Sequence, residues 1–143
     1  MESGVAFAQL DFDLAPEDRV QQLRRQLGVS TFGLNLIVLQ PGQAGRIHRH
    51  ERQEEVYLVL DGELSLLVEG EEHVLGAGAI ARVAPESRRQ LVNRRPRRVA
   101  LLALGSANAH EGRDGVAFPS WDATEGAPPQ QVPLPADVPV DPA

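Results

Sequence analysis

The 143-residue sequence lacks both cysteine and lysine. Because cysteine is absent, neither disulfide bonds nor thiolate ligands are available, and any metal ion must be bound by nitrogen and oxygen atoms. Because lysine is absent, all 14 of the Lys and Arg positions are arginine, a bias typical of a GC-rich bacterial genome. We therefore expect a bacterial source, and we give clusters of arginine little weight as evidence for a binding site.

Long apolar segments are missing as well, and no stretch approaches the length of a membrane span. Met1 to Gly4 do not begin a basic segment followed by an apolar one, so no signal peptide is expected. The formal net charge of -6 argues against nucleic acid as the main partner. We expect a cytoplasmic protein that binds neither membranes nor nucleic acid.

The sequence does contain a series of short apolar segments, most of them bounded by glycine or proline. A chain of this length predicts one domain, and strands at this spacing predict an antiparallel barrel or sandwich. Asp61-Gly62 is a strong signal for a hairpin turn. The expected strands are 31–40, 55–60, 64–68, 73–75, 79–84, 91–92 and 99–104.

The N-terminal residues 1–30 have a different character. We expect an arm followed by one short helix at about 16–27. Pro16 suits the first turn of a helix, and Gly28 is a suitable stop. This part is predicted to pack on one end of the barrel.

The C-terminal residues 106–143 also differ from the strand region. Residues 106–126 predict a loop that lays Phe118 and Trp121 on the barrel surface. Proline recurs every few residues from position 128 onwards, which predicts an irregular extended tail. The alternative is an arm that docks on a second subunit.

Two of the four histidines, His48 and His50, are separated by a single residue. On a strand, residues i and i+2 point to the same face, so both imidazoles would aim at one point and Arg49 would aim away from it. A carboxylate follows at Glu54 or Glu55. Two imidazoles and one carboxylate on a sheet can bind a divalent metal ion, although two polar residues in an exposed strand would give the same pattern.

One block resembles the first sequence motif of the cupin superfamily without a gap, with matching residues at Gly42, His48, His50, Glu55 and Gly62. The resemblance implies an all-β antiparallel fold, the double-stranded β-helix or jelly-roll barrel, over residues 31–105. It also implies that the two histidines and Glu55, rather than Glu54, are metal ligands inside the barrel. Cupins are commonly dimers, so we expect a homodimer.

Residues 78–93 look like an altered copy of the second cupin motif, which normally supplies a further histidine. Its histidine position falls on Gln90 when counted from Pro85, and on Arg89 when counted back from Asn93. Arginine stays protonated and cannot bind a metal ion. Gln90 is therefore predicted to lie beside the ion as a weak fourth ligand or as a support for bound water.

Other residues could contribute to such a site. His73, in a hairpin, and His110, after the last strand, are the alternative histidine ligands. Tyr57 and Glu51 are candidates for a general base, but no catalytic residue follows from the sequence. The arginines that could ring a cavity for an anionic molecule are Arg46, Arg82, Arg88 and Arg89.

The strand predicted at 55–60 is apolar on both faces. If Glu55 points into the barrel, Tyr57 and Val59 share its face, and the outer face carries Val56, Leu58 and Leu60. A strand with two apolar faces needs cover on both of them. The outer cover is expected to be the second subunit of the homodimer.

These observations leave two main hypotheses of function. The first is a metal-dependent enzyme of oxygenase or isomerase type, with one divalent transition metal ion and a small, anionic substrate. Imidazole and carboxylate ligands suit Fe, Mn, Ni, Cu and Zn alike. The second is a non-catalytic small-molecule binding or sensor barrel, which the altered second motif favours. A metal-free structural barrel would leave His48 and His50 as ordinary polar residues of the cavity.

Overall fold

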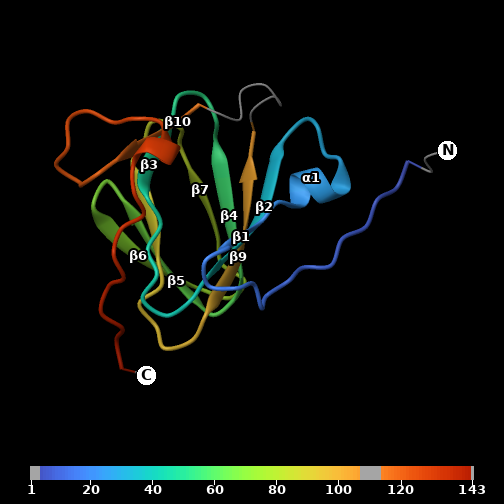
Figure 1. The fold of residues 1–143 in the computed structure, drawn as a ribbon, viewed down its shortest axis with the longest axis horizontal. Helices are drawn as coiled ribbons and strands as arrows, with labels where there is room; N and C mark the ends of the chain where they lie inside the picture. Colours follow the sequence, from blue (N-terminus) through green and yellow to red (C-terminus); the bar gives the residue numbers. More distant parts are fainter. Residues whose placement is uncertain (1–3, 107–113, 143) are drawn as a thin grey trace.

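The computed structural model describes residues 4–106 and 114–142. Within them, two five-stranded sheets lie face to face (Figure 1), and all pairings between named strands are antiparallel. The strand order is β1-β2-β9-β4-β7 in the first sheet and β10-β3-β8-β5-β6 in the second sheet. The elements are β1 (Val20–Gln21), α1 (Leu23–Leu27), β2 (Gly33–Leu39), β3 (Ile47–His50), β4 (Glu55–Asp61), β5 (Glu63–Val68), β6 (Glu71–Gly76), β7 (Ile80–Val83), β8 (Arg89–Val92), β9 (Val99–Gly105), β10 (Gly115–Phe118) and the 3-10 helix η2 (Pro129–Gln131).

The core lies between the two sheets and takes every second residue of their strands. Val99, Leu101 and Ala103 of β9 are buried in one apolar cluster with Tyr57 of β4 and Leu64 of β5. Successive side chains of a strand point to opposite faces, so this spacing of two places one face of each strand in the core. The all-β antiparallel fold expected from the sequence is confirmed.

The chain turns at Gly62 between β4 and β5, but the hairpin predicted at Asp61-Gly62 is wrong, because these two strands belong to different sheets and do not pair with each other. Gly62 has a φ of 83°, in the left-handed region that favours glycine. A Cβ at this position would collide with the carbonyl oxygen of Arg98. Glycine is therefore required here, both for the turn and for the close approach of the neighbouring chain.

The N-terminal helix is shorter than predicted, and its expected start near residue 16 is wrong. α1 begins at Leu23 and ends before Gly28, which has a φ of 72° and is the predicted stop. Residues 20 and 21 form β1 instead and pair with the edge of β2. That pairing satisfies backbone N–H and C=O groups at an otherwise open sheet edge, and it overrides the helical pattern. Among the described residues, no helix has the length and apolar character needed to cross a membrane.

The N-terminal segment covers part of the outer face of the first sheet. Leu10, Phe12 and Leu14 pack against a second apolar cluster, which consists of Leu23, Leu36, Val38 and Ala100. Before Leu10 the chain leads away from the sheets (Figure 1), and Phe7 is 88% exposed. The chain itself therefore supplies some of the outer cover that the sequence suggested would come from a second subunit.

The C-terminal segment is more ordered than predicted. The loop expected over 106–126 contains strand β10, which pairs with the open edge of β3, and Phe118 is buried. The described residues from 128 onwards contain no strand, as their prolines predict (Figure 1). They run beside the segment before β3, where Nε of Arg46 donates to the Val132 carbonyl and the Val138 N–H donates to the Gly42 carbonyl. The division of the chain at residues 30 and 105 stays a prediction, and each flanking segment adds one strand to a barrel sheet.

Leu36→Ala should lower the free energy of unfolding by about 2–5 kcal/mol, because it removes a buried side chain between the sheet and the N-terminal segment. Leu36 is fully buried, whereas Val74 on β6 is 58% exposed. Val74→Ala is therefore the control, with an expected change below about 0.5 kcal/mol. Urea unfolding at neutral pH measures both. Similar small losses in the two variants would contradict the packing of this cluster.

Candidate metal centre

Two strands that are consecutive in the chain but belong to opposite sheets, β3 and β4, bring His48, His50 and Glu55 together. Both histidines lie on β3 and point to one face, while Arg49 between them points away and pairs with Glu51 at 3.0 Å. Residues 51–54 then cross to the first sheet, where Glu55 begins β4. One ligand atom from each of the three residues lies within 4.8 Å of the others. The predicted strand geometry thus creates a compact group of two imidazoles and one carboxylate.

The imidazoles are oriented by their Nδ1 atoms. The Nδ1 of His48 lies 3.0 Å from the carbonyl oxygen of Arg46. A carbonyl can only accept a hydrogen bond, so this Nδ1 carries the hydrogen, and Nε2 faces Glu55 at 3.6 Å. The Nδ1 of His50 lies 2.8 Å from Oδ1 of Asp114, and its Nε2 lies 3.1 Å from Oε1 of Glu55. Both Nε2 atoms therefore point at the same carboxylate oxygen.

The Glu55 carboxylate also has a permanent counter-ion inside the barrel. Nη2 of Arg89 donates to its Oε1 at 3.0 Å, and the Tyr57 hydroxyl donates to the same oxygen at 2.7 Å. The Arg89 side chain is 0% exposed, and its Nη1 donates to the carbonyls of Pro85 and Ser87. A buried charge needs such partners, and here the guanidinium has both a carboxylate and backbone acceptors.

The protonation of these groups follows from burial and from one another. Burial would raise the pKa of Glu55, but the hydrogen bonds and charges of His48 and His50 hold that pKa well below its usual value. Burial would lower the pKa of His50, but Glu55 and then Asp114 outweigh it and raise that pKa. Burial and the charge of Glu55 raise the pKa of Tyr57 well above its usual value. Its hydroxyl therefore stays protonated and is not suited to act as a general base.

Arg89, rather than Gln90, lies beside the three residues. Arg89 is opposite His48 in the pairing of β3 with β8, so the two side chains share the inner face. Because side chains alternate along β8, Gln90 lies on the other face, where its Nε2 donates to the carbonyl of Gly45 at 3.0 Å. The structure therefore does not bring Gln90 into the cluster, and the count back from Asn93 gives the residue that does face it.

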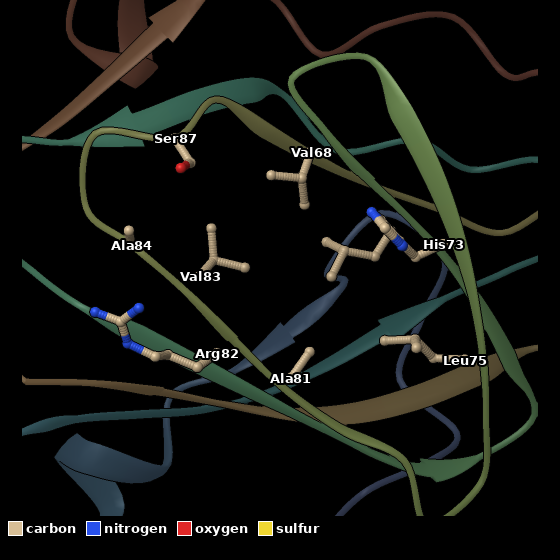
Figure 2. A pocket seen from close by; sticks show the side chains of 9 residues that line it. Val68, His73, Leu75, Ala81, Arg82, Val83, Ala84 and Ser87 are labelled. Atoms are coloured by element: carbon tan, nitrogen blue, oxygen red, sulfur yellow. The ribbon is translucent and has the colours of Figure 1, made fainter.

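His73 belongs to a different cavity. This cavity has a volume of about 320 Å³, lies between β6 and β7, and is lined by His73 and by apolar side chains such as Val68 and Leu75 (Figure 2). None of the three clustered residues lines it. Arg82, at the side away from His73, forms an ion pair with Glu54. His110, the other alternative histidine, lies outside the described residues.

A larger cavity, of about 500 Å³, opens beside His48. Inward-facing residues of β2 and β8 form its apolar floor, namely Ile37, Leu39 and Leu91. Its polar lining consists of Glu17, Asp18, Arg19, Asn35 and Arg46, and the C-terminal segment closes one side with Pro129 and Leu134. The Asn35 side chain makes no hydrogen bond within the described residues. An apolar floor with a few polar groups is typical of a small-molecule site.

Two arginines of this cavity are held by backbone carbonyls only. Nε of Arg46 donates to Val132 at 2.6 Å, and Nη1 of Arg19 donates to Ala44 at 2.9 Å. Neither guanidinium forms an ion pair within the described part of the chain. Of the other arginines expected around the cavity, Arg88 instead lies over the ring of Phe118, 3.6 Å from its centroid.

The comparisons with known proteins agree with this fold. The sequence profile of the Cupin domain family matches residues 35–105, and the chain belongs to the cupin superfamily. No curated protein matches the sequence. A cupin protein from Bacteroides fragilis is 21% identical, with 75% of this chain and 86% of that chain covered and a TM-score of 0.65. A sugar phosphate isomerase from a cupin superfamily, from Silicibacter pomeroyi, is 26% identical, with 92% and 90% covered and a TM-score of 0.60.

Sequence reasoning missed three residues of the site and the cavity. Asp114 is 64 positions away from His50 and lies in no motif. Arg19 lies within the region 16–27, which was predicted as helix. Asn35 did carry a signal, because strand alternation places this polar residue on the same inner face as Ile37 and Leu39.

The stability of the protein without metal should depend on pH through His50. Its pKa is raised by folding, so its contribution to the free energy of unfolding is fully present below the unfolded-state value of about 6.5 and is lost as the pH rises through the folded-state value. His50→Asn should therefore lower the free energy of unfolding more at about pH 6 than at about pH 8.5. Urea unfolding of both proteins in the presence of a chelator measures this loss. His73→Asn is the control for a histidine elsewhere in the barrel. A difference for His50→Asn that does not change with pH would contradict this account.

Proposed function

We propose that the protein is a metal-dependent enzyme that holds one divalent transition metal ion with His48, His50 and Glu55. The orientation of the imidazoles carries this proposal, because each Nδ1 faces an oxygen acceptor and each Nε2 faces the same carboxylate oxygen. Two nitrogen donors and one oxygen donor fit Fe, Mn, Ni, Cu or Zn. A bound ion would supply Lewis-acid polarisation of a substrate oxygen.

The substrate that we propose is a small, oxygen-rich, anionic molecule. A cavity of about 500 Å³ beside His48 suits a ligand of that size. The guanidinium groups of Arg46 and Arg19 are available to a carboxylate or phosphate, and Asn35 is available to hydroxyl groups. We favour isomerisation, because it needs no second substrate and because the similarity to the relative named as a sugar phosphate isomerase extends over 92% of this chain.

His48→Ala or His50→Ala should abolish stoichiometric metal binding, since each change removes a direct ligand. Gln90→Ala should leave binding intact, because the Gln90 amide faces Gly45. His73→Ala is the matched histidine control, since His73 lines the other cavity. Calorimetric titration with Zn, Mn, Ni and Fe(II), with elemental analysis of the purified protein, measures the effect. The absence of a saturable site in the wild type would contradict the metal centre.

Arg46→Gln should weaken the binding of sugar phosphates by about 10- to 100-fold, the loss expected for one hydrogen bond to a charged group. Glutamine can still donate to the Val132 carbonyl, so the C-terminal segment should stay in place. Arg97→Gln, at a side chain that is 70% exposed, controls for net charge. A panel of aldose and ketose phosphates, tested for binding and for interconversion with each metal, gives the measurement. Equal affinities for the two variants would contradict the role of Arg46.

The second candidate is a non-catalytic small-molecule binding or sensor barrel. Arg89 favours it, because a guanidinium already neutralises Glu55 where the family pattern has a further histidine. Ligand binding without turnover, whichever metal is supplied, would support this alternative. The cytoplasmic location and the absence of nucleic-acid and membrane partners stay predictions.

We also propose a homodimer that buries the outer face of β4 and β7. Val56 and Leu58 are half-buried on this face, and Ile80, which is opposite Leu58, is 65% exposed. The N-terminal segment covers only the other side of the face, around Leu36. We favour a second copy as the cover, because the N-terminal segment, with its exposed Phe7, leads away from its own sheet and would gain contacts on a partner.

Ile80→Glu should shift the protein from dimer to monomer, because it places an unpaired charge in an apolar interface. Sedimentation at micromolar concentration measures the change. Val74→Glu is the control, since Val74 is an exposed apolar residue on the second sheet. A monomeric wild type under these conditions would contradict the homodimer.

A further inference from the structure

The Asp114 carboxylate reaches the metal centre from outside the region that the cupin profile matches. It directly precedes β10, nine positions beyond the last matched residue at 105. The pairing of β10 with β3 sets Gly115 opposite His50, and the Glu51 N–H donates to the Asp114 carbonyl at 3.1 Å. The strand register thus delivers this side chain to His50, and only 9% of the side chain is exposed.

The carboxylate has two separate tasks at this point. Its Oδ2 accepts the backbone N–H groups of Arg52 at 2.9 Å and Gln53 at 2.8 Å. Its Oδ1 faces Nδ1 of His50 at 2.8 Å, and Nε2 of Gln53 donates to it at 3.3 Å. One oxygen therefore holds the turn that leads from His50 to Glu55, and the other holds the imidazole.

We propose that Asp114 is a positioning residue that keeps the hydrogen of neutral His50 on Nδ1, so that the Nε2 lone pair faces the metal ion. His50 lies between two carboxylates, and its hydrogen could point to either. Oε1 of Glu55 already faces the Arg89 guanidinium and the Tyr57 hydroxyl, which weakens it as an acceptor. Asp114 is bound by amide N–H groups and makes the shorter contact with His50. This inference rests on the proposed metal centre.

Asp114→Asn separates the two tasks. The two backbone N–H groups at Oδ2 require an acceptor, so the single amide oxygen of asparagine should take that place and preserve the turn. The asparagine NH2 group then faces Nδ1 of His50, which has to accept a hydrogen bond. The imidazole hydrogen should consequently move to Nε2, where it blocks metal binding. Metal affinity should fall by about 10- to 100-fold, as for other partners of ligating histidines.

The experiment compares the metal-free, 15N-labelled wild type with Asp114→Asn and with Glu51→Gln by NMR at about pH 9, where imidazoles are neutral. The 15N shifts of the His50 ring report which nitrogen carries the hydrogen. Glu51→Gln removes one negative charge from the same turn, at a side chain that is 57% exposed and pairs with Arg49. Calorimetric titration with Zn then gives the metal affinity of each protein.

The expected result is a hydrogen on Nδ1 in the wild type and in Glu51→Gln, and on Nε2 in Asp114→Asn, with weaker Zn binding only in the last. A wild-type hydrogen on Nε2, or an unchanged tautomer in Asp114→Asn, would overturn the inference. If Asp114→Asn does not fold, the tautomer of the wild type decides alone. If no protein binds metal, the metal centre is wrong, and the tautomer comparison still tests the action of Asp114 on His50.

Discussion

A buried carboxylate is the constraint on which the interior of this barrel depends. Moving Glu55 out of water costs several kcal/mol unless its charge is paired and hydrogen-bonded. One of its oxygens receives Arg89 from β8 and Tyr57 from β4 itself, and it faces His50 from β3. These contacts require strands of both sheets to meet at one point. The polar centre therefore ties the sheets together beside the apolar core.

Arg89 changes what a metal ion would meet in this cupin. In the family pattern a neutral histidine would stand at this position, but here a fully buried guanidinium does. The negative charge of Glu55 is consequently already balanced by Arg89 in the protein without metal. A bound ion would share the carboxylate with this guanidinium. The ion and the Arg89 guanidinium are like charges, and like charges repel one another more strongly in a poorly solvated interior than in water. We therefore expect weaker, more exchangeable metal binding than a site with a fourth neutral ligand would give.

The sequence was most informative where the interactions are local. His48, His50 and Glu55 fall within eight positions, and strand alternation alone predicts that the two imidazoles share a face. The sequence could not decide whether Arg89 or Gln90 faces the three ligands, because a shift of one residue moves a side chain to the other face of the strand. Only the pairing of β3 with β8 decides it. The predicted start of α1 was wrong for a similar reason, since the pairing of β1 with β2 is a long-range interaction.

The segments on either side of the cupin match control the surroundings of the ligands. Asp114 holds His50, and Arg46, whose carbonyl faces His48, is itself tied to Val132 in the C-terminal segment. The same C-terminal segment and the turn around Arg19 form part of the wall of the cavity beside His48. The matched region thus supplies the three ligands, while the flanking segments supply the orientation of one ligand and much of the cavity wall. Differences in substrate choice from other cupins should therefore arise in these flanking segments, because fold and ligand set alone do not select a reaction.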